Sequence, residues 1–205
     1  LLRTRVAPPT MIEHLAKGGV WIVPIFAFAL LATVIAIGKS VQFARLPKLQ
    51  PILPSAQTAG PGFMDQLQGA QREVVRVAQA AASSEQRDDM LFSLLLGERA
   101  KLERFLGAIA VTATVSPLLG LLGTVSGMIT TFNMMTLFGA GDPAVVSGGI
   151  SEALVTTELG LIVAIPALIL HALLSRKATA YAEGLEASAI ALTQQQAVVT
   201  VVPSS

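Results

Sequence analysis

Two carboxylates and two threonines lie within one strongly apolar segment of the chain. Residues 148–167 read Gly-Gly-Ile-Ser-Glu-Ala-Leu-Val-Thr-Thr-Glu-Leu-Gly-Leu-Ile-Val-Ala-Ile-Pro-Ala and include Glu152, Thr156, Thr157 and Glu158. A charge in hydrocarbon costs about 3 kcal/mol or more, so ionisable residues in such a segment face a protein interior or a water path. The chemistry to expect is therefore an ion route or a polar seam between subunits.

The two glutamates differ in their predicted surroundings. Glu152 shares a helical face with Thr156 near one end of the segment, where it either bonds neighbouring polar groups or relays protons. Glu158 lies deeper and on another face. Because the chain has no Lys or Arg at matching depth, both carboxylates must be neutral, hydrated or paired with another subunit. We predict polar support inside the membrane from Glu152, Thr156 and Glu158.

Two stripes of small residues recur at spacings of three and four. They are Ala113, Pro117, Gly120, Thr124, Gly127 and Thr131 on one segment, and Ala153, Thr157, Gly160, Ala164, Ala167 and His171 on the other. Small residues let helices approach closely in lipid, so plain helix packing explains both stripes. A lone threonine often only bonds its own helix. Thr124 and Thr157 together on two such faces favour a lined cavity, and we predict that both line a pore.

Each of these segments also contains a proline. Pro117 and Pro166 lack the backbone N–H that a helix needs, so both are predicted to bend their helices. Such bends are common in any bundle of membrane helices.

Composition and hydropathy define the elements that carry these residues. The chain is 53% hydrophobic and only 13% charged, a balance typical of membrane proteins. A helix needs about 20 apolar residues to cross a bilayer. We predict an all-α membrane protein with three transmembrane helices and long cytoplasmic helical extensions. The predicted segments are an N-terminal periplasmic segment 1–19, spans 20–44, 105–138 and 147–175, a cytoplasmic region 45–104, a periplasmic loop 139–146, and a cytoplasmic C-terminal helix and tail 176–205.

The orientation follows from the positively charged residues. Basic residues follow the first span, precede the second and follow the third: Lys39, Arg45, Lys48, Arg99, Lys101, Arg104, Arg176 and Lys177. The loop between the second and third spans has none. The positive-inside rule therefore predicts an N-terminus outside the cytoplasm and a cytoplasmic C-terminus.

The cytoplasmic region is predicted to begin with a Pro- and Gly-rich linker, 47–61, followed by helices over 64–82 and 85–104. Ser83 or Ser84 would cap the second of these helices. Because no Gly or Pro separates Arg104 from Phe105, we expect one helix to run from the cytoplasm straight into the membrane. The tail from 178 to 196 is predicted to be an amphipathic helix.

Several kinds of function are not indicated. A net charge of +1 without a basic patch gives no reason to expect nucleic acid. The chain has no nucleotide or cofactor motif, no cysteine, and two isolated histidines that cannot form a metal cage, so no cofactor or metal is predicted. Because the chain starts with Leu and not Met, we expect a longer native N-terminal region or a removed signal peptide.

Two motifs resemble those of a known family. Residues 116–128, Ser-Pro-Leu-Leu-Gly-Leu-Leu-Gly-Thr-Val-Ser-Gly-Met, are similar to the second-span motif of the MotA/TolQ/ExbB proton channel family, and residues 149–166 are similar to its third-span motif. The resemblance covers residues 12–182 and is strongest to the ExbB branch, then TolQ. MotA proteins have four spans and fit less well.

The resemblance implies a proton-motive-force-driven motor in a bacterial inner membrane. It implies a homopentamer around a dimer of single-span, ExbD-like partners, which drives a TonB-like transducer for outer-membrane transport. Thr124 and Thr157 match pore-facing threonines, and Glu152 matches a glutamate at the outer part of the third span. The proton-carrying aspartate belongs to the partner. Glu158 departs from the family pattern, which is apolar at this position in many members. The sequence Thr-Thr-Glu at 156–158 resembles ExbB-like variants that have an extra N-terminal periplasmic region.

Other interpretations are also possible. A TolQ-like motor would serve envelope maintenance and not transport. In a different class, the chain could be an autonomous ion channel or a scaffold, although a mostly apolar lining tends to dewet and close. An intramembrane serine protease would need Ser126 and His171 to meet, and their predicted depths place them too far apart.

Overall fold

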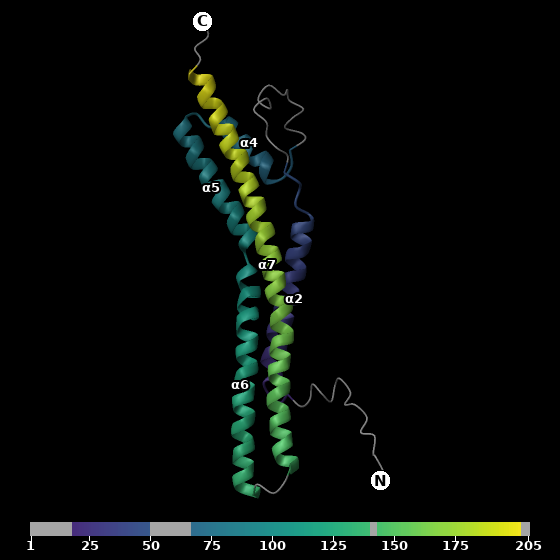
Figure 1. Cartoon of the computed structure of the whole chain (residues 1–205). Coiled ribbons are helices and arrows are strands. Elements are labelled where there is room, and N and C mark those ends of the chain that lie inside the picture. Colours follow the sequence, from purple (N-terminus) through teal and green to yellow (C-terminus); the bar gives the residue numbers. More distant parts are fainter. Residues whose placement is uncertain (1–17, 50–66, 140–142, 202–205) are drawn as a thin grey trace. The chain divides into compact units, whose positions relative to one another are not determined.

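The computed structural model describes residues 18–49, 67–139 and 143–201, and every regular element in these ranges is a helix. The helices are α2 (Ile22–Ala44), α4 (Ala70–Ala80), α5 (Ser84–Glu103), α6 (Leu106–Phe138) and α7 (Pro143–Val201) (Figure 1). The predicted all-α class is confirmed. The segment 1–17, most of the predicted linker 47–61, the first residues of the predicted helix 64–82 and part of the predicted loop 139–146 lie outside the described residues.

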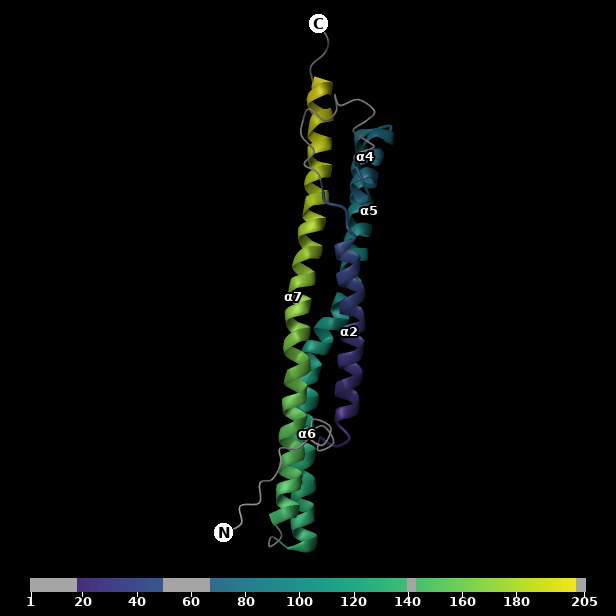
Figure 2. The ribbon, with the colours of Figure 1, turned by 90° about the vertical axis from the view of Figure 1, so that its right-hand side faces the viewer.

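Helix α7 is one unbroken element of 59 residues (Figure 2). The sequence suggested a third span followed by a separate tail helix, whereas the structure has a single helix through both. It begins at Pro143, inside the predicted loop, where proline is favoured because the first helical N–H has no partner in any case. Pro117 in α6 and Pro166 in α7 also lie within continuous helix. The bends expected at these two prolines stay predictions.

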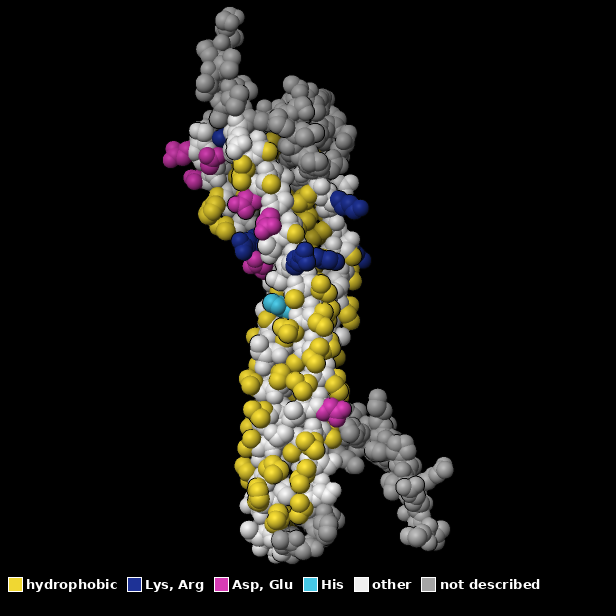
Figure 3. Space-filling view, in the orientation of Figure 1, with side chains coloured by type: hydrophobic (Ala, Val, Ile, Leu, Met, Phe, Trp, Pro, Cys, Tyr) yellow, Lys and Arg dark blue, Asp and Glu magenta, His cyan; other side chains and the backbone are white. Residues whose placement is uncertain are grey.

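Three helical stretches, in α2, α6 and α7, are long and apolar enough to cross a membrane. Their outward faces carry large apolar side chains, such as Val23, Leu118 and Leu168, each more than half exposed. Figure 3 shows apolar side chains over the visible face of α6. Apolar surface of this extent requires lipid or another protein to cover it.

The chain divides into two compact units. We call the first the apolar unit; its described residues lie within Leu1–Ile37 and Gly107–His171. We call the second the polar unit; its described residues lie within Gly38–Leu106 and Ala172–Ser205. In the apolar unit, Ile25 of α2 packs in a buried cluster with Val155 and Leu159 of α7. In the polar unit, α4, α5 and the end of α7 share a core formed by Leu67, Val74, Val75, Ala78, Leu91, Leu185, Ala189 and Leu192.

Helix α4 begins later than expected. The sequence suggested a helix from residue 64, but residues 67–69 are not helical and α4 starts at Ala70. Gly69 has a φ of 61°, a left-handed conformation that interrupts a helix and suits glycine. Leu67, just before this turn, is buried in the core of the polar unit. The requirement to bury Leu67 by a turn therefore outweighs the helical pattern there.

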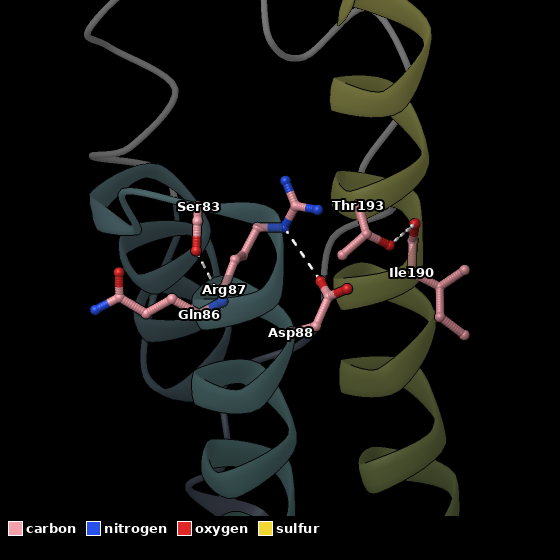
Figure 4. A network of polar contacts seen from close by, with 6 residues as sticks. All are labelled: Ser83, Gln86, Arg87, Asp88, Ile190 and Thr193. Atoms are coloured by element: carbon pink, nitrogen blue, oxygen red, sulfur yellow. Dashed lines mark hydrogen bonds and ion pairs between the residues drawn. The ribbon is translucent and has the colours of Figure 1, made fainter.

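The start of α5 is capped as predicted. The backbone N–H of Gln86 donates to Ser83 Oγ at 3.2 Å (Figure 4). Gln86 Oε1 accepts from the N–H of Ala82 at 3.3 Å. This reciprocal arrangement resembles a capping box, in which two otherwise unpaired N–H groups gain partners.

Replacing Ser83 with Ala should destabilise the polar unit by about 1 kcal/mol, because one N–H at the start of α5 loses its acceptor. Hydrogen–deuterium exchange should show faster exchange confined to the first turn of α5. Ser93→Ala is the control, since the Ser93 hydroxyl bonds only the carbonyl of Met90 within the same helix. Equal exchange in the two variants would contradict the assigned cap.

The junction between α5 and α6 differs from the sequence prediction. Helix α5 ends at Glu103, Arg104 has an extended ψ of 130°, and α6 begins at Leu106. Between them Phe105 has a φ of 68°, a conformation that costs a non-glycine residue about 1–3 kcal/mol. The prediction of one continuous helix across Arg104 and Phe105 is therefore wrong. No local sequence signal marks this break, so contacts elsewhere in the fold must stabilise it.

Candidate functional site

Helices α6 and α7 meet along a line of glycines, which we call the glycine seam: Gly120, Gly123 and Gly127 of α6 with Gly149 and Gly160 of α7. A Cβ atom added at Gly160 would lie 2.6 Å from the carbonyl oxygen of Ser116. One added at Gly120 would lie 3.0 Å from Thr157 Cα. The two backbones thus approach more closely than any residue with a side chain would permit at these positions.

The two predicted pore threonines are linked through this seam. Thr157 Oγ1 donates to the carbonyl oxygen of Gly120 at 3.2 Å, across the two helices. In an α-helix that same carbonyl accepts the backbone N–H four residues later, which here belongs to Thr124. The Thr124 hydroxyl donates to the carbonyl of Leu121 at 2.6 Å. Both threonines are half-buried and lie at the edge of the seam.

This arrangement has a chemical consequence. A threonine hydroxyl has one proton to donate and two lone pairs that can accept. Thr124 and Thr157 both direct their protons to backbone carbonyls. The two hydroxyl oxygens can therefore only accept hydrogen bonds from a group beside the seam. Such an edge suits water, hydronium or a protonated carboxyl better than a bare carboxylate.

Thr156 lies inside the seam. It is 0% exposed, and its hydroxyl donates to the carbonyl of Ala153 at 2.9 Å. A Cβ atom added at Gly123 would lie 2.6 Å from Thr156 Oγ1, so Thr156 fills the space that Gly123 leaves. In the same way, Thr131 Oγ1 contacts Gly149 where a side chain would otherwise be. These two threonines are packing elements of the interface within this chain.

The structure separates the members of each predicted stripe. Gly120, Gly127 and Thr131 contact α7, whereas Pro117 and Thr124 are only half-buried. On α7 the alanines and Gly160 are buried, whereas Thr157 and His171 are half-buried. Helix packing within one chain thus explains most of both stripes.

The predicted stripes left out two glycines of the seam, Gly123 and Gly149, and two buried polar residues near it. Gly123 lies three residues after Gly120 and four before Gly127, a spacing that could have identified it. Thr112 and Ser116 are each 0% exposed. Ser116 Oγ has no hydrogen-bond partner among the described residues. Both lie a turn or two before Gly120 on the same side of α6, which helical spacing from Gly120 would have indicated.

The two glutamates have different surroundings. The carboxylate of Glu152 contacts Gly19, which has a φ of 59° and lies just before α2. Beside it, a Cβ atom added at Gly18 would lie 3.3 Å from Val155 Cγ1. A carboxylate near a helix N-terminus is favoured by the helix dipole. Glu158 is exposed on another side of α7. The structure therefore places Glu152 at the start of α2 and Glu158 on an outer surface.

A serine–histidine dyad is excluded by the packing. Ser126 adjoins Gly127, which lies against Ala153 of α7. His171 is 18 residues farther along the same continuous helix, about 27 Å away. Within the described residues, no group of three or more His, Cys, Asp or Glu side chains could hold a metal ion.

The fold and the seam define an all-helical, multi-pass membrane protein in which a close helix contact carries half-buried threonine hydroxyls at its edge. Residues 63–187, more than half of the chain, match the model of the MotA/TolQ/ExbB proton channel family. The chain belongs to this family, as its two motifs suggested, and membership makes it a non-enzymatic transport protein of the membrane.

Individual relatives agree with this assignment. The ExbB-like 3 biopolymer transport protein of Synechocystis is 35% identical over 165 residues, which cover 74% of this chain and 79% of that protein. ExbB of Salmonella typhimurium is 37% identical over 75 residues, 37% of this chain and 31% of that protein. TolQ of Pseudomonas aeruginosa is 40% identical over 74 residues, 36% of this chain and 32% of that protein. The matches to Salmonella ExbB and to Pseudomonas TolQ thus each span under a third of the length of those proteins.

Proposed function

We propose that the chain is the multi-span subunit of a proton-motive-force-driven motor, and that the edge of the glycine seam is its working surface. The observation that carries the proposal is the hydrogen bond from Thr157 Oγ1 to the Gly120 carbonyl, one helical turn before Thr124. Because the Thr124 hydroxyl bonds the Leu121 carbonyl, both hydroxyls are held by backbone acceptors in an apolar setting. An apolar surface with two oriented acceptors is suited to a protonated acid.

The acid in this proposal comes from another chain. Glu152 contacts Gly19 before α2, and Glu158, which directly follows Thr157, is exposed, so we assign to neither of them the acid that meets the threonine pair. We place there the carboxyl group of an ExbD-like single-span helix, two copies of which occupy the pore of a homopentamer. Membership of the MotA/TolQ/ExbB family supports a partner of this kind.

Protonation would then control movement of the partner helix. A neutral carboxyl group can donate a hydrogen bond to Thr157 or Thr124 and can move along an apolar surface. An ionised carboxylate stays in contact with water because its desolvation is costly. Protons driven inward by the membrane potential thus bias the helix between positions. A TonB-like transducer would take up this motion, with the N-terminus of the chain in the periplasm and its C-terminus in the cytoplasm of a bacterial inner membrane.

A TolQ-like role in the cell envelope is the second candidate. The TolQ relative is 40% identical over 74 residues, much like the ExbB relative at 37% over 75. The degree of similarity therefore does not favour one transducer over the other. An autonomous channel is less well supported, because most groups around the threonine pair are apolar and such a lining expels water.

Native mass spectrometry of the detergent-solubilised protein, purified from its own host, tests this proposal. We expect five copies of the chain with two copies of a small single-span protein. The mass of that protein would identify the partner. A stable assembly of this chain alone, obtained under equally gentle conditions, would favour a channel or a scaffold.

A further inference from the structure

Lys39 is a buried cation near the end of α2. Lys39 is only 5% exposed. Its Nζ donates to the carbonyl oxygens of Lys101 at 3.1 Å and Leu102 at 2.9 Å. The ring of Phe43, one turn farther along α2, lies 5.9 Å from the same Nζ. A lysine held so fully between two helices is unusual, because burying a charge requires compensating partners.

The two carbonyls that Lys39 contacts belong to the last turn of α5. In a continuous helix they would accept the N–H groups of Phe105 and Leu106. Because Arg104 is extended and Phe105 is left-handed, the helix ladder stops, and only the Arg104 N–H still bonds back, to Ala100 at 3.0 Å. The ends of helices carry unpaired carbonyls with partial negative charge. Lys39 supplies the missing donors and the matching positive charge.

The chain also passes between its two compact units at these places. It passes in α2 between Ile37 and Gly38, and after α5 between Leu106 and Gly107. Lys39 thus lies at the first passage and the break at Phe105 lies at the second. Both belong to the polar unit, whereas α6 from Gly107 onward, with Thr124, belongs to the apolar unit.

We infer that Lys39 is a positioning residue, a lock that fastens the end of α5 to α2 and so stabilises a joint at Arg104–Phe105. Lys39 takes the place of the Phe105 and Leu106 N–H groups at these carbonyls, so α5 can end at Glu103 and α6 can start as a new helix at Leu106. This inference goes beyond the motor proposal and does not depend on the identity of the partner.

Spin labels provide the direct test. The chain has no cysteine, so Ala44→Cys and Gly97→Cys introduce a single labelled pair on exposed positions of α2 and α5. Double electron–electron resonance on labelled subunits diluted with unlabelled ones reports the distance between the two labels within one polar unit. We expect a narrow distribution in the parent chain, a broader one in Lys39→Met, and a narrow one again in Lys39→Arg, since arginine can also donate to two carbonyls.

Exchange measurements give the magnitude and the control. Loss of the bonds to Lys101 and Leu102 should speed hydrogen–deuterium exchange in the last turn of α5 about tenfold in Lys39→Met. Lys48→Met, which changes an exposed lysine of the same unit, should leave exchange unchanged. An unaltered distance distribution and unaltered exchange in Lys39→Met would overturn the lock.

A second pair of variants tests the joint without altering Lys39. At the left-handed φ of Phe105, glycine is favoured over alanine, whereas alanine is favoured in a continuous helix. Phe105→Gly should therefore melt at a higher temperature than Phe105→Ala, even if Lys39→Met does not accumulate. The reverse order would overturn the joint. Failure to find a partner by mass spectrometry would leave these results intact, so the two proposals can fail separately.

Discussion

Gly160→Ala should markedly destabilise the protein, by about 1–3 kcal/mol. The added methyl group would lie 2.6 Å from the carbonyl oxygen of Ser116 and 3.3 Å from Gly120 Cα, both of which are backbone atoms. Backbone of a packed helix cannot rotate away as a side chain can, so α6 and α7 must separate. Because the Thr157–Gly120 hydrogen bond spans this contact, the threonine pair should lose its alignment as well.

The matched control is the same substitution on the same helix. Gly148 in α7 has nothing within 4 Å of an added Cβ atom. Gly148→Ala should therefore be neutral or stabilising by up to about 1 kcal/mol, through helix propensity alone. The measurement is the temperature at which the solubilised oligomer is lost from size-exclusion profiles. Similar losses for the two variants would show that the close approach at Gly160 is unimportant.

Thr157→Val should strongly reduce proton flux while the protein still assembles. Valine has nearly the shape of threonine, so it removes the hydroxyl and its bond to Gly120 but preserves the packing. Without that acceptor, the protonated acid of the partner loses a hydrogen bond in an apolar setting, and we expect roughly a tenfold or greater fall in proton flux. Flux is measured in proteoliposomes that contain the chain with its copurified partner.

Two comparisons make this result interpretable. Thr157→Ser retains the hydroxyl and should retain most of the flux. Thr156→Val removes a neighbouring hydroxyl that bonds only within α7 and is fully buried in the seam, so its effect should be on stability and not on flux. If Thr157→Val conducts like the parent chain while Thr157→Ser does not, the hydroxyl is not the functional group.

The packing also gives the small residues of the two motifs separate roles. Gly120, Gly127 and Gly160 permit the helices to touch, whereas Thr124 and Thr157 remain half-buried at the boundary of that contact. A surface that must guide a proton carrier needs fixed groups, and close packing of the backbones behind them fixes these. In our interpretation, stability and function therefore depend on adjacent positions of the same helices.

The sequence alone determined the features that depend on local pattern. Long apolar runs identified helices able to cross a membrane, the pair Ser83 and Ser84 identified the start of α5, and the motifs at 116–128 and 149–166 identified the family. These signals are contained in neighbouring residues, because hydropathy and capping act over a few turns of one helix. The sequence also suggested Thr124 and Thr157 as a pair, although their role in a pore is a prediction.

Only the tertiary structure decided which residues meet. The contact of Glu152 with Gly19, the nesting of Thr156 into Gly123, and the break at Phe105 all depend on helices that are distant in the chain. The clearest case is Lys39, which appeared in the sequence as one more basic residue beside a span and instead caps a helix that ends 64 residues later, at Glu103. Helical periodicity states which side chains share a face, but only packing determines which face of another helix lies opposite.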